Sequence, residues 1–499
     1  MLFNSKEFML FLPLVFLLYW FVFDKFLGGF KYKLLLQNAF VVIASYVFYG
    51  WWDWRFLLLI AFTSFCSWFS GIIIQRIDKN YDEHLIKNKK VIRKRKLITA
   101  TNIIINLAIL ATFKYYDFFV AEFAKLFHLS YDALLLNIIL PVGISFYTFQ
   151  ALSYTIDVYR RNTEPTKDIV AFFAFISFFP QLVAGPIERA SNLLPQFLKK
   201  REFVYATAVD GCRQILWGLF KKIVVADNCA IVVDQIYSDY ANMPSSLLMV
   251  GLIFFAFQFY GDFSGYSDIA MGTAKLFGIN LMRNFNVPYF SRDIVDFWRR
   301  WHISLTKWMT DYVFIPLSFL LRKWGECGFI VAIFVNMLVV GLWHGANWTF
   351  IAWGAYNAIL YLTHVLLNKN YKYKGKVEDN RMLPSLKDFV LMFKTFLLVV
   401  LGGIFFRAET IEDAWHYFVS LLSLEIWRTP YSFFSYPMNY AWLYVLVMLV
   451  VEWIHRKREH GLEIGALKYT WLRIMIYYSL IFMVFLYSGN SEQFVYFQF

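Results

Sequence analysis

Two histidines stand in surroundings that could support catalysis. His302 follows the run Asp296-Phe-Trp-Arg-Arg-Trp, and His344 follows Gly341-Leu-Trp and precedes Gly345. A neutral imidazole, with an unperturbed pKa of about 6.5, suits the role of a general base. Hydrogen-bond donors close to such a base can stabilise a developing oxyanion. We therefore expect acid–base chemistry at these two positions, and we favour His344 as the base.

The surroundings of His302 combine aromatic and charged side chains. Helical spacing would place Trp298 one turn before the histidine, and Asp296 one turn from Arg299 and Arg300. This interpretation predicts an aromatic ring, two guanidinium groups and an imidazole on one helix, where they could orient a donor or stabilise a tetrahedral intermediate. A structural histidine in a buried salt-bridge network is the alternative, and the local sequence does not decide between them.

His344 lies at the end of a long apolar run. An ionisable side chain at membrane depth is costly and is by default a candidate functional residue. Gly341 and Gly345 are expected to leave room for a substrate, Trp343 and Trp348 to wall the site, and Asn347 to donate a hydrogen bond. A histidine that only contacts a neighbouring helix is the alternative interpretation.

Other common catalytic signatures are absent from the sequence. It contains no G-x-S-x-G elbow, no G-x-x-x-x-G-K-[ST] phosphate loop and no H-E-x-x-H zinc helix. The four cysteines are widely separated, so the sequence predicts neither a disulfide framework nor a metal site. Of the remaining six histidines, three lie in or beside basic loops (His84, His455 and His460) and three have no clustered partners (His128, His364 and His416). We interpret all six as structural or solvated.

The composition sets the kind of scaffold that must position these histidines. Of the 499 residues, 59% are hydrophobic and only 17% are charged, which is too little polar surface for a soluble globule of this size. Apolar runs long enough to cross a bilayer recur along the chain, and we predict an all-α polytopic membrane protein with about ten to twelve spanning helices. The net charge of +13 falls in short connections, which favours membrane topology over nucleic-acid binding.

The basic connections predict an orientation. Lysines and arginines cluster at 24–35, 75–98 and 455–470, and cytoplasmic loops carry such an excess. The spans between these loops then place both the N-terminus and the C-terminal tail, 489–499, outside the cytoplasm.

The segment 261–321 differs from the rest of the chain because charged residues interrupt it. The potential helix breakers that accompany them are Gly261, Gly265, Gly278, Pro288 and Pro316. Such a segment cannot face lipid, so we expect short, tilted or re-entrant helices that are buried in protein or line a cavity.

The two histidine segments, 296–305 and 341–347, resemble the signature motifs of the membrane-bound O-acyltransferase superfamily, and the histidines lie 42 residues apart in the chain. Further segments resemble the bacterial alginate O-acetyltransferase branch, which is related to the membrane subunits of peptidoglycan O-acetyltransferase and teichoic-acid D-alanyltransferase. These segments are 146–160, 183–187, 262–268 and 283–289.

The resemblance implies a single acyltransferase domain, 1–488, with its core at 134–366, built around a central tunnel in the bacterial plasma (inner) membrane. It implies no bound cofactor, and a cytoplasmic thioester donor that is acyl-CoA, in this branch acetyl-CoA, or an acylated carrier protein. Its implied partners are membrane lipids, an extracytoplasmic SGNH-type O-acetyltransferase and a cytoplasmic acyl-carrier protein, with no nucleic acid. The tunnel residues we assign to substrate binding are Asp262, Ser264, Tyr266, Asp268, Trp298, Arg299, Arg300, Trp343 and Asn347.

The last residues, Phe494-Val-Tyr496-Phe-Gln-Phe499, have the pattern F-x-Y-x-x-F. This pattern is similar to the C-terminal motif of the partner peptide in the teichoic-acid D-alanylation system, where a tyrosine is proposed to carry the acyl group. The similarity implies that Tyr496 is a catalytic acyl carrier. An aromatic anchor at the membrane interface is the alternative.

Three classes of function remain at this point. An acyltransferase requires that the two histidines meet at one site, and it could move acetyl or D-alanyl groups. A proton-coupled transporter with His344 as its relay should show internal repeats and paired carboxylates in its spans, which the sequence lacks. A non-catalytic scaffold would tolerate alanine at both histidines.

Overall fold

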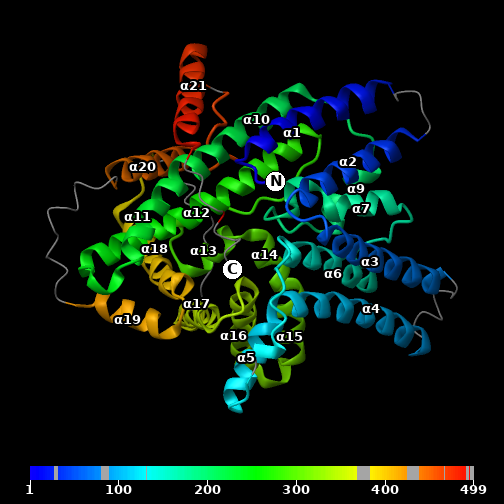
Figure 1. Cartoon of the computed structure of the whole chain (residues 1–499), viewed down its shortest axis with the longest axis horizontal. Helices are drawn as coiled ribbons and strands as arrows, with labels where there is room; N and C mark the ends of the chain where they lie inside the picture. Colours follow the sequence, from blue (N-terminus) through cyan, green and yellow to red (C-terminus); the bar gives the residue numbers. More distant parts are fainter. Residues whose placement is uncertain are drawn as a thin grey trace. The chain divides into compact units, whose positions relative to one another are not determined.

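The computed structural model describes residues 1–26, 32–79, 89–130, 132–367, 382–423, 438–465, 467–489 and 494 (Figure 1). These residues form helices joined by short connections. The chain divides into two compact units, the first made of Met1–Cys212 and Ala270–Met282, the second of Arg213–Ile269 and Arg283–Phe499.

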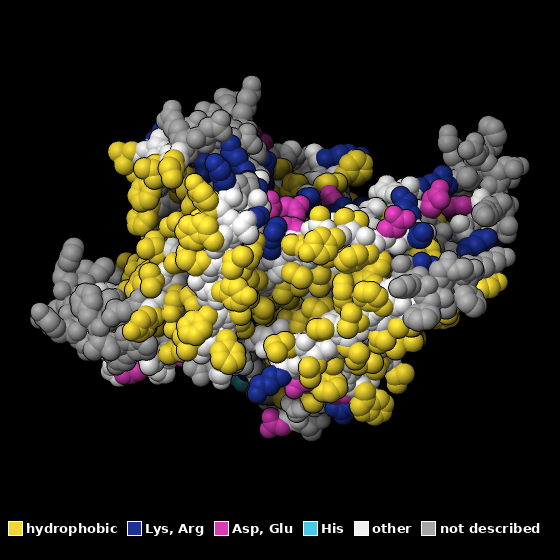
Figure 2. Space-filling model, turned by 90° about the horizontal axis from the view of Figure 1, so that it is seen from above, with side chains coloured by type: hydrophobic (Ala, Val, Ile, Leu, Met, Phe, Trp, Pro, Cys, Tyr) yellow, Lys and Arg dark blue, Asp and Glu magenta, His cyan; other side chains and the backbone are white. Residues whose placement is uncertain are grey.

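Eight helices in the described part of the chain are long and apolar enough to cross a membrane, and Tyr440–Ile454 is a shorter apolar helix. Lipid offers no hydrogen bonds to the backbone, so a spanning segment must satisfy its N–H and C=O groups internally, as a helix does. Hydrophobic side chains dominate the face shown in Figure 2, as expected of a surface in contact with lipid. These features confirm the predicted all-α polytopic membrane protein.

The first unit is centred on α6 (Ile144–Arg160), which packs against α3 (Phe56–Lys79) and α4 (Lys89–Leu110). Nearly every side chain of α6 is buried. The other helices of this unit are α1 (Lys6–Leu17), η1 (Leu18–Phe26), α2 (Lys33–Gly50), η2 (Ala111–Tyr115), α5 (Tyr116–Leu126), η3 (Asp132–Leu134), α7 (Ile169–Ser177), α8 (Phe179–Leu182), α9 (Ala190–Leu198) and the first part of α10 (Tyr205–Leu219).

The second unit contains both predicted catalytic histidines. Its core helices α16 (Gly325–His344), α17 (Trp348–Leu367) and α18 (Leu386–Arg407) pack side by side in chain order. The others are η4 (Phe220–Ala226), α11 (Asp227–Tyr237), η5 (Tyr240–Asn242), most of α12 (Ser245–Leu276), η6 (Pro288–Phe290), α13 (Ile294–Arg300), α14 (Ile303–Met309), η7 (Thr310–Phe314), α15 (Ile315–Leu320), η8 (Arg322–Trp324), α19 (Ile411–Leu421), α20 (Met438–Ile454) and α21 (Thr470–Tyr487).

The predicted helix break at Gly261 and Gly265 is wrong, because α12 runs through both positions over 32 residues. The glycines serve close packing instead. A Cβ on Gly265 would lie 2.7 Å from the carbonyl oxygen of Gly218, and one on Gly261 would lie 3.0 Å from that of Lys221. The short helices expected in this segment are present, but they begin only at Pro288.

Candidate active site

His302 lies in a turn between two short helices. α13 ends at Arg300 because Trp301 is extended and His302 adopts a left-handed conformation, with φ of 40°. The prediction that His302 shares one helix with Trp298 is therefore wrong. Asp296 and Arg300 do lie one helical turn apart, as the spacing predicted, and they form an ion pair with 2.7 Å between Oδ1 and Nε, whereas Arg299 is exposed.

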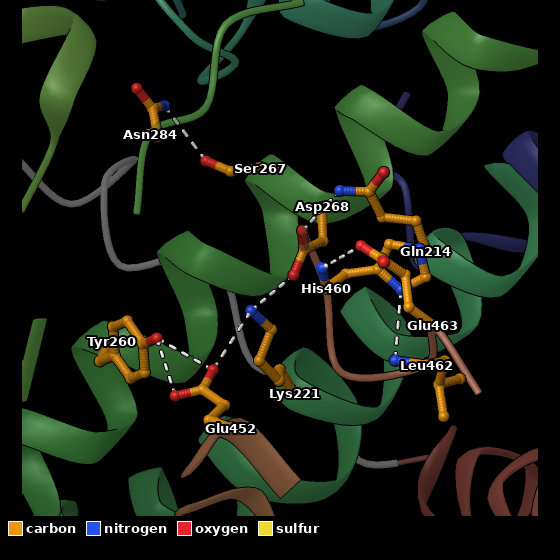
Figure 3. A network of polar contacts seen from close by, with 10 residues as sticks. All are labelled: Gln214, Lys221, Tyr260, Ser267, Asp268, Asn284, Glu452, His460, Leu462 and Glu463. Atoms are coloured by element: carbon orange, nitrogen blue, oxygen red, sulfur yellow. Dashed lines mark hydrogen bonds and ion pairs between the residues drawn. The ribbon is translucent and has the colours of Figure 1, made fainter. Parts of the chain in front are cut away.

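Asn284 holds this turn in place. Its backbone oxygen accepts a hydrogen bond from the amide of Ile303 (2.8 Å), and its Oδ1 accepts one from Ser304 Oγ (2.6 Å). Its Nδ2 donates to Ser267 Oγ on α12 at 3.2 Å, as Figure 3 shows. A strained backbone conformation persists only when its surroundings compensate the cost, which is on the order of 1–3 kcal/mol. We infer that Asn284 is a positioning residue for His302.

Replacing Asn284 by alanine is expected to reduce kcat on the order of 10-fold while leaving KM nearly unchanged, because a loosened turn misplaces His302 without removing a binding contact. Steady-state kinetics of the purified protein can measure both parameters. Asn242→Ala is a control, since its exposed side chain donates a hydrogen bond to the nearby exposed Asp239. A change confined to KM would contradict the positioning role.

His344 is the last residue of α16. The expectation that Gly341 and Gly345 leave room for a substrate is wrong, because Phe350 occupies that space. A Cβ on Gly345 would lie 2.2 Å from Phe350 Cε2, and one on Gly341 would lie 2.2 Å from the Phe350 carbonyl oxygen. These glycines allow α16 and α17 to approach closely, and this packing orients His344.

One aromatic cluster joins the two histidines. The ring centroid of Trp343 lies 5.7 Å from that of His302 and 4.9 Å from that of His344. Both histidines are at least 95% buried. The structure therefore brings together the two side chains that the sequence motifs singled out, with Trp343 as their shared wall. Trp348, which was also expected to wall the site, is instead 50% exposed.

Several members of this cluster were not predicted. Trp353 and Phe406 each place their ring 5.1 Å from His344, and Phe263 places its ring 4.7 Å from His302. Phe406 is far from His344 in the chain, and no local pattern marks it. The predicted Trp298 contributes indirectly, with its ring 5.9 Å from that of Trp353.

A cavity of about 60 Å³ opens beside His344. Residues of α12, α13, α17 and α18 complete its walls, together with Tyr289, whose hydroxyl donates to the carbonyl oxygen of Ala256. The lining residues are mainly aromatic or aliphatic, and none of them is Asp, Glu, Lys or Arg. His344 thus faces a small apolar space into which part of a substrate can fit.

A buried ionic network flanks the cluster (Figure 3). Lys221 Nζ lies 2.6 Å from Asp268 Oδ2 and 3.9 Å from Glu452 Oε1. Tyr260 donates its hydroxyl hydrogen to Glu452, and Gln214 Nε2 donates to Asp268 Oδ1. Tyr260 also packs against Trp301, with 6.1 Å between the two ring centroids. The network therefore supports the residue that directly precedes His302 in the chain.

A second buried ionic group is centred on Lys222, the residue after Lys221 in the chain. Lys222 Nζ is 2.8 Å from both Asp227 Oδ1 and Asp262 Oδ1. Asp262 and Asp268, predicted as substrate-binding residues, therefore each neutralise a buried lysine. Their role toward substrate stays a prediction, as does that of Ser264, which is buried on the same helix.

Replacing Lys221 by methionine is expected to destabilise the protein by about 3–5 kcal/mol, because two carboxylates would lose their buried cation. The thermal unfolding midpoint in detergent should fall. The midpoint of Lys221→Arg, which keeps the positive charge, should lie between those of Lys221→Met and the unmodified protein. Lys323→Met, at an exposed position, serves as the matched control. An unchanged midpoint for Lys221→Met would contradict this assignment.

Asn347 is occupied by contacts within the protein. Its Oδ1 accepts a hydrogen bond from the amide of Thr349 at 3.1 Å, and its Nδ2 donates to the carbonyl oxygen of Glu409 at 2.9 Å. The first contact satisfies a free amide at the start of α17. Its hydrogen bond to a substrate stays a prediction.

Phe494 is the first residue of the C-terminal F-x-Y-x-x-F pattern. It packs against α12, the helix that carries Phe263. It is 97% buried, and its ring lies 4.9 Å from that of Tyr266 and 6.2 Å from that of Phe263. Tyr266, predicted as a tunnel residue, is thus part of its seat. Tyr496 and Phe499 lie outside the described residues.

Comparison with known proteins agrees with this geometry. Residues 164–395 match the sequence model of the membrane-bound O-acyltransferase family. The chain is 37% identical to a protein of Pseudomonas aeruginosa named "Probable alginate O-acetylase", over 86% of this chain and 76% of that protein. It is also 31% identical to the peptidoglycan O-acetyltransferase of Helicobacter pylori, over 83% and 78% of the two chains.

A teichoic acid D-alanyltransferase of Streptococcus thermophilus is 30% identical over 55% of this chain and 69% of its own length. These matches confirm the family that the two histidine motifs indicated, and the geometry brings both motifs to one buried cluster. The chain therefore belongs to the membrane-bound O-acyltransferase family and is a multi-pass membrane O-acyltransferase.

Proposed function

We propose that this protein moves an acetyl group from a cytoplasmic thioester donor to Tyr496 on its C-terminal tail, from which a separate extracytoplasmic SGNH-type transferase passes it to a cell-surface polysaccharide. The donor is acetyl-CoA or an acetylated carrier protein. In this proposal the protein lies in the bacterial inner membrane with both termini outside, because the basic loops belong on the cytoplasmic side. The acceptor class follows relatives named for alginate and peptidoglycan O-acetylation.

The observation that carries this proposal is the burial of Phe494 beside the histidine cluster. Phe494 contacts Phe263 and Tyr266, and Phe263 contacts His302. Tyr496 follows Phe494 by two residues, and an extended chain covers about 7 Å over that distance. A tail whose first aromatic residue is seated at the cluster can therefore bring its tyrosine within reach of the reacting groups.

The chemistry needs only groups that this chain supplies. The phenolic oxygen of Tyr496 attacks the thioester carbonyl carbon while the imidazole of His344 takes the phenolic proton. The tetrahedral intermediate then expels the thiolate, which receives that proton from the imidazolium. The products are an acetyl ester of Tyr496 and the free thiol, so atoms and charge balance. An aryl ester is more activated than an alkyl ester, so transfer onward to a serine of a partner enzyme is downhill.

Intact-mass analysis of the C-terminal peptide tests this proposal directly. The purified protein is incubated with isotopically labelled acetyl-CoA, acetylated carrier protein or D-alanylated carrier protein. We expect one labelled acetyl group on the peptide that contains Tyr496. A labelled D-alanyl group there would reject acetyl as the transferred group, and a label found only elsewhere in the chain would reject the tail as the carrier.

A further inference from the structure

The cavity beside His344 has a size that can discriminate between acyl groups. An apolar protein cavity of about 150 Å³ holds benzene, which corresponds to about 25 Å³ per carbon atom. By that measure the 60 Å³ available here accommodates two to three non-hydrogen atoms. An acetyl group has three and therefore fills the cavity with its carbonyl end at His344, whereas a propionyl group, with four, exceeds the space.

The uncharged lining of the cavity excludes acyl groups that carry a charge. A D-alanyl group carries an ammonium ion, which is costly to bury unless a carboxylate pairs with it. No acidic residue belongs to the lining. The buried carboxylates of this unit, such as Asp268 and Asp262, already pair with Lys221 and Lys222. The cavity therefore favours a small, uncharged acyl group.

Two small residues on α18 form part of the cavity wall, so their size sets the volume that remains for an acyl group. Val400 is buried and contributes only two methyl groups to the lining. Gly403, one turn later, contributes no side chain, and a Cβ there would lie 3.3 Å from Phe255 Cδ1 and 3.4 Å from Leu252 Cδ1. An added methyl group would thus press on Phe255, which also lines the cavity.

We propose that this cavity selects a two-carbon acyl group, and that Val400 and Gly403 are the residues that determine the permitted acyl length. The proposal rests on the proposed function, since it assigns the acyl end of the donor to the side of His344 that faces α18. It adds the residues that separate acetyl from longer and from charged acyl groups.

The test compares acetyl-, propionyl- and butyryl-CoA with the full-length protein in detergent. Release of free CoA reports donor use, and intact mass reports acylation of the tail. One methylene in a fitted apolar pocket changes selectivity by about 10–200-fold. We therefore expect the unmodified protein to prefer acetyl over propionyl by at least about 10-fold.

Val400→Ala should shift the propionyl-to-acetyl ratio upward by about 10-fold, because it removes two methyl groups from the wall. Gly403→Ala should lower the use of propionyl further. Val390→Ala is the matched control on the same helix, where the side chain is 55% exposed, and its ratio should equal that of the unmodified protein. Because each result is a ratio measured on one preparation, a partial loss of folded protein does not obscure it.

Equal use of acetyl and propionyl by the unmodified protein would overturn this inference, as would the same ratio in Val400→Ala and Val390→Ala. The two proposals fail separately. Selective CoA release with no acyl group on the tail supports the cavity assignment and contradicts the tail relay. Acylation of the tail by all three donors at one rate supports the relay and contradicts the cavity assignment.

Discussion

Replacing His344 by alanine is expected to lower acyl transfer by about 10²–10⁴-fold, the range typical for loss of a general base. His344 is buried between Trp343, Trp353 and Phe406 at the mouth of an apolar cavity, so water cannot readily replace its imidazole. Transfer of labelled acetyl to the tail measures the loss.

His302→Ala should cause a loss in the same range, because His302 shares the wall formed by Trp343 and can orient the donor or stabilise the oxyanion. The control is His416→Ala, whose side chain is exposed and lies beside Glu412 at 3.7 Å. This control should retain full activity. Expression and mass in detergent should be unchanged in all three variants. Near-normal activity in either cluster variant would remove that histidine from the mechanism, and near-normal activity in both would indicate a scaffold.

Tyr496→Phe is expected to abolish acylation of the polymer, because the substitution keeps the aromatic ring and removes only the nucleophilic oxygen. Phe494 would still hold the tail against Tyr266, so the variant separates chemistry from anchoring. Polymer acylation in cells that also contain the partner transferase is the measurement.

Tyr478→Phe provides the control for the tail experiment. This tyrosine lies on α21 and is 70% exposed, so loss of its hydroxyl should not alter transfer. If Tyr496→Phe supports full polymer acylation, the tail is a membrane anchor and the acyl group takes another route. Phe494→Ala, by contrast, should weaken transfer without abolishing it, because the nucleophile remains while its seat is lost.

Local sequence patterns were sufficient to predict the helical membrane scaffold and to single out the two histidines. Long apolar runs predict helices in lipid because no other local structure satisfies the backbone there. The motifs around His302 and His344 identify both residues, although only the fold shows that Trp343 contacts both rings. The motif resemblance also predicted the family correctly.

Local patterns failed where tertiary packing overrides propensity. Gly261 and Gly265 appeared to break a helix, yet α12 continues because its neighbour approaches too closely for any side chain there. Helical spacing placed His302 on one helix with Trp298, yet hydrogen bonds that Asn284 accepts from Ile303 and Ser304 stabilise a turn instead. Both errors have the same origin, since the deciding partner is distant in sequence.

The sequence by itself therefore determined the membrane class, the helical architecture and the two histidine motifs that indicate the family, because composition and short motifs act over a few residues. Only the tertiary structure decided which residues surround those histidines. The residues in and beside the cluster come from separate parts of the chain, as Phe406, the pair Lys221 and Glu452, and Phe494 show. Their contacts depend on how helices pack, and packing depends on side-chain shapes that meet across long sequence separations.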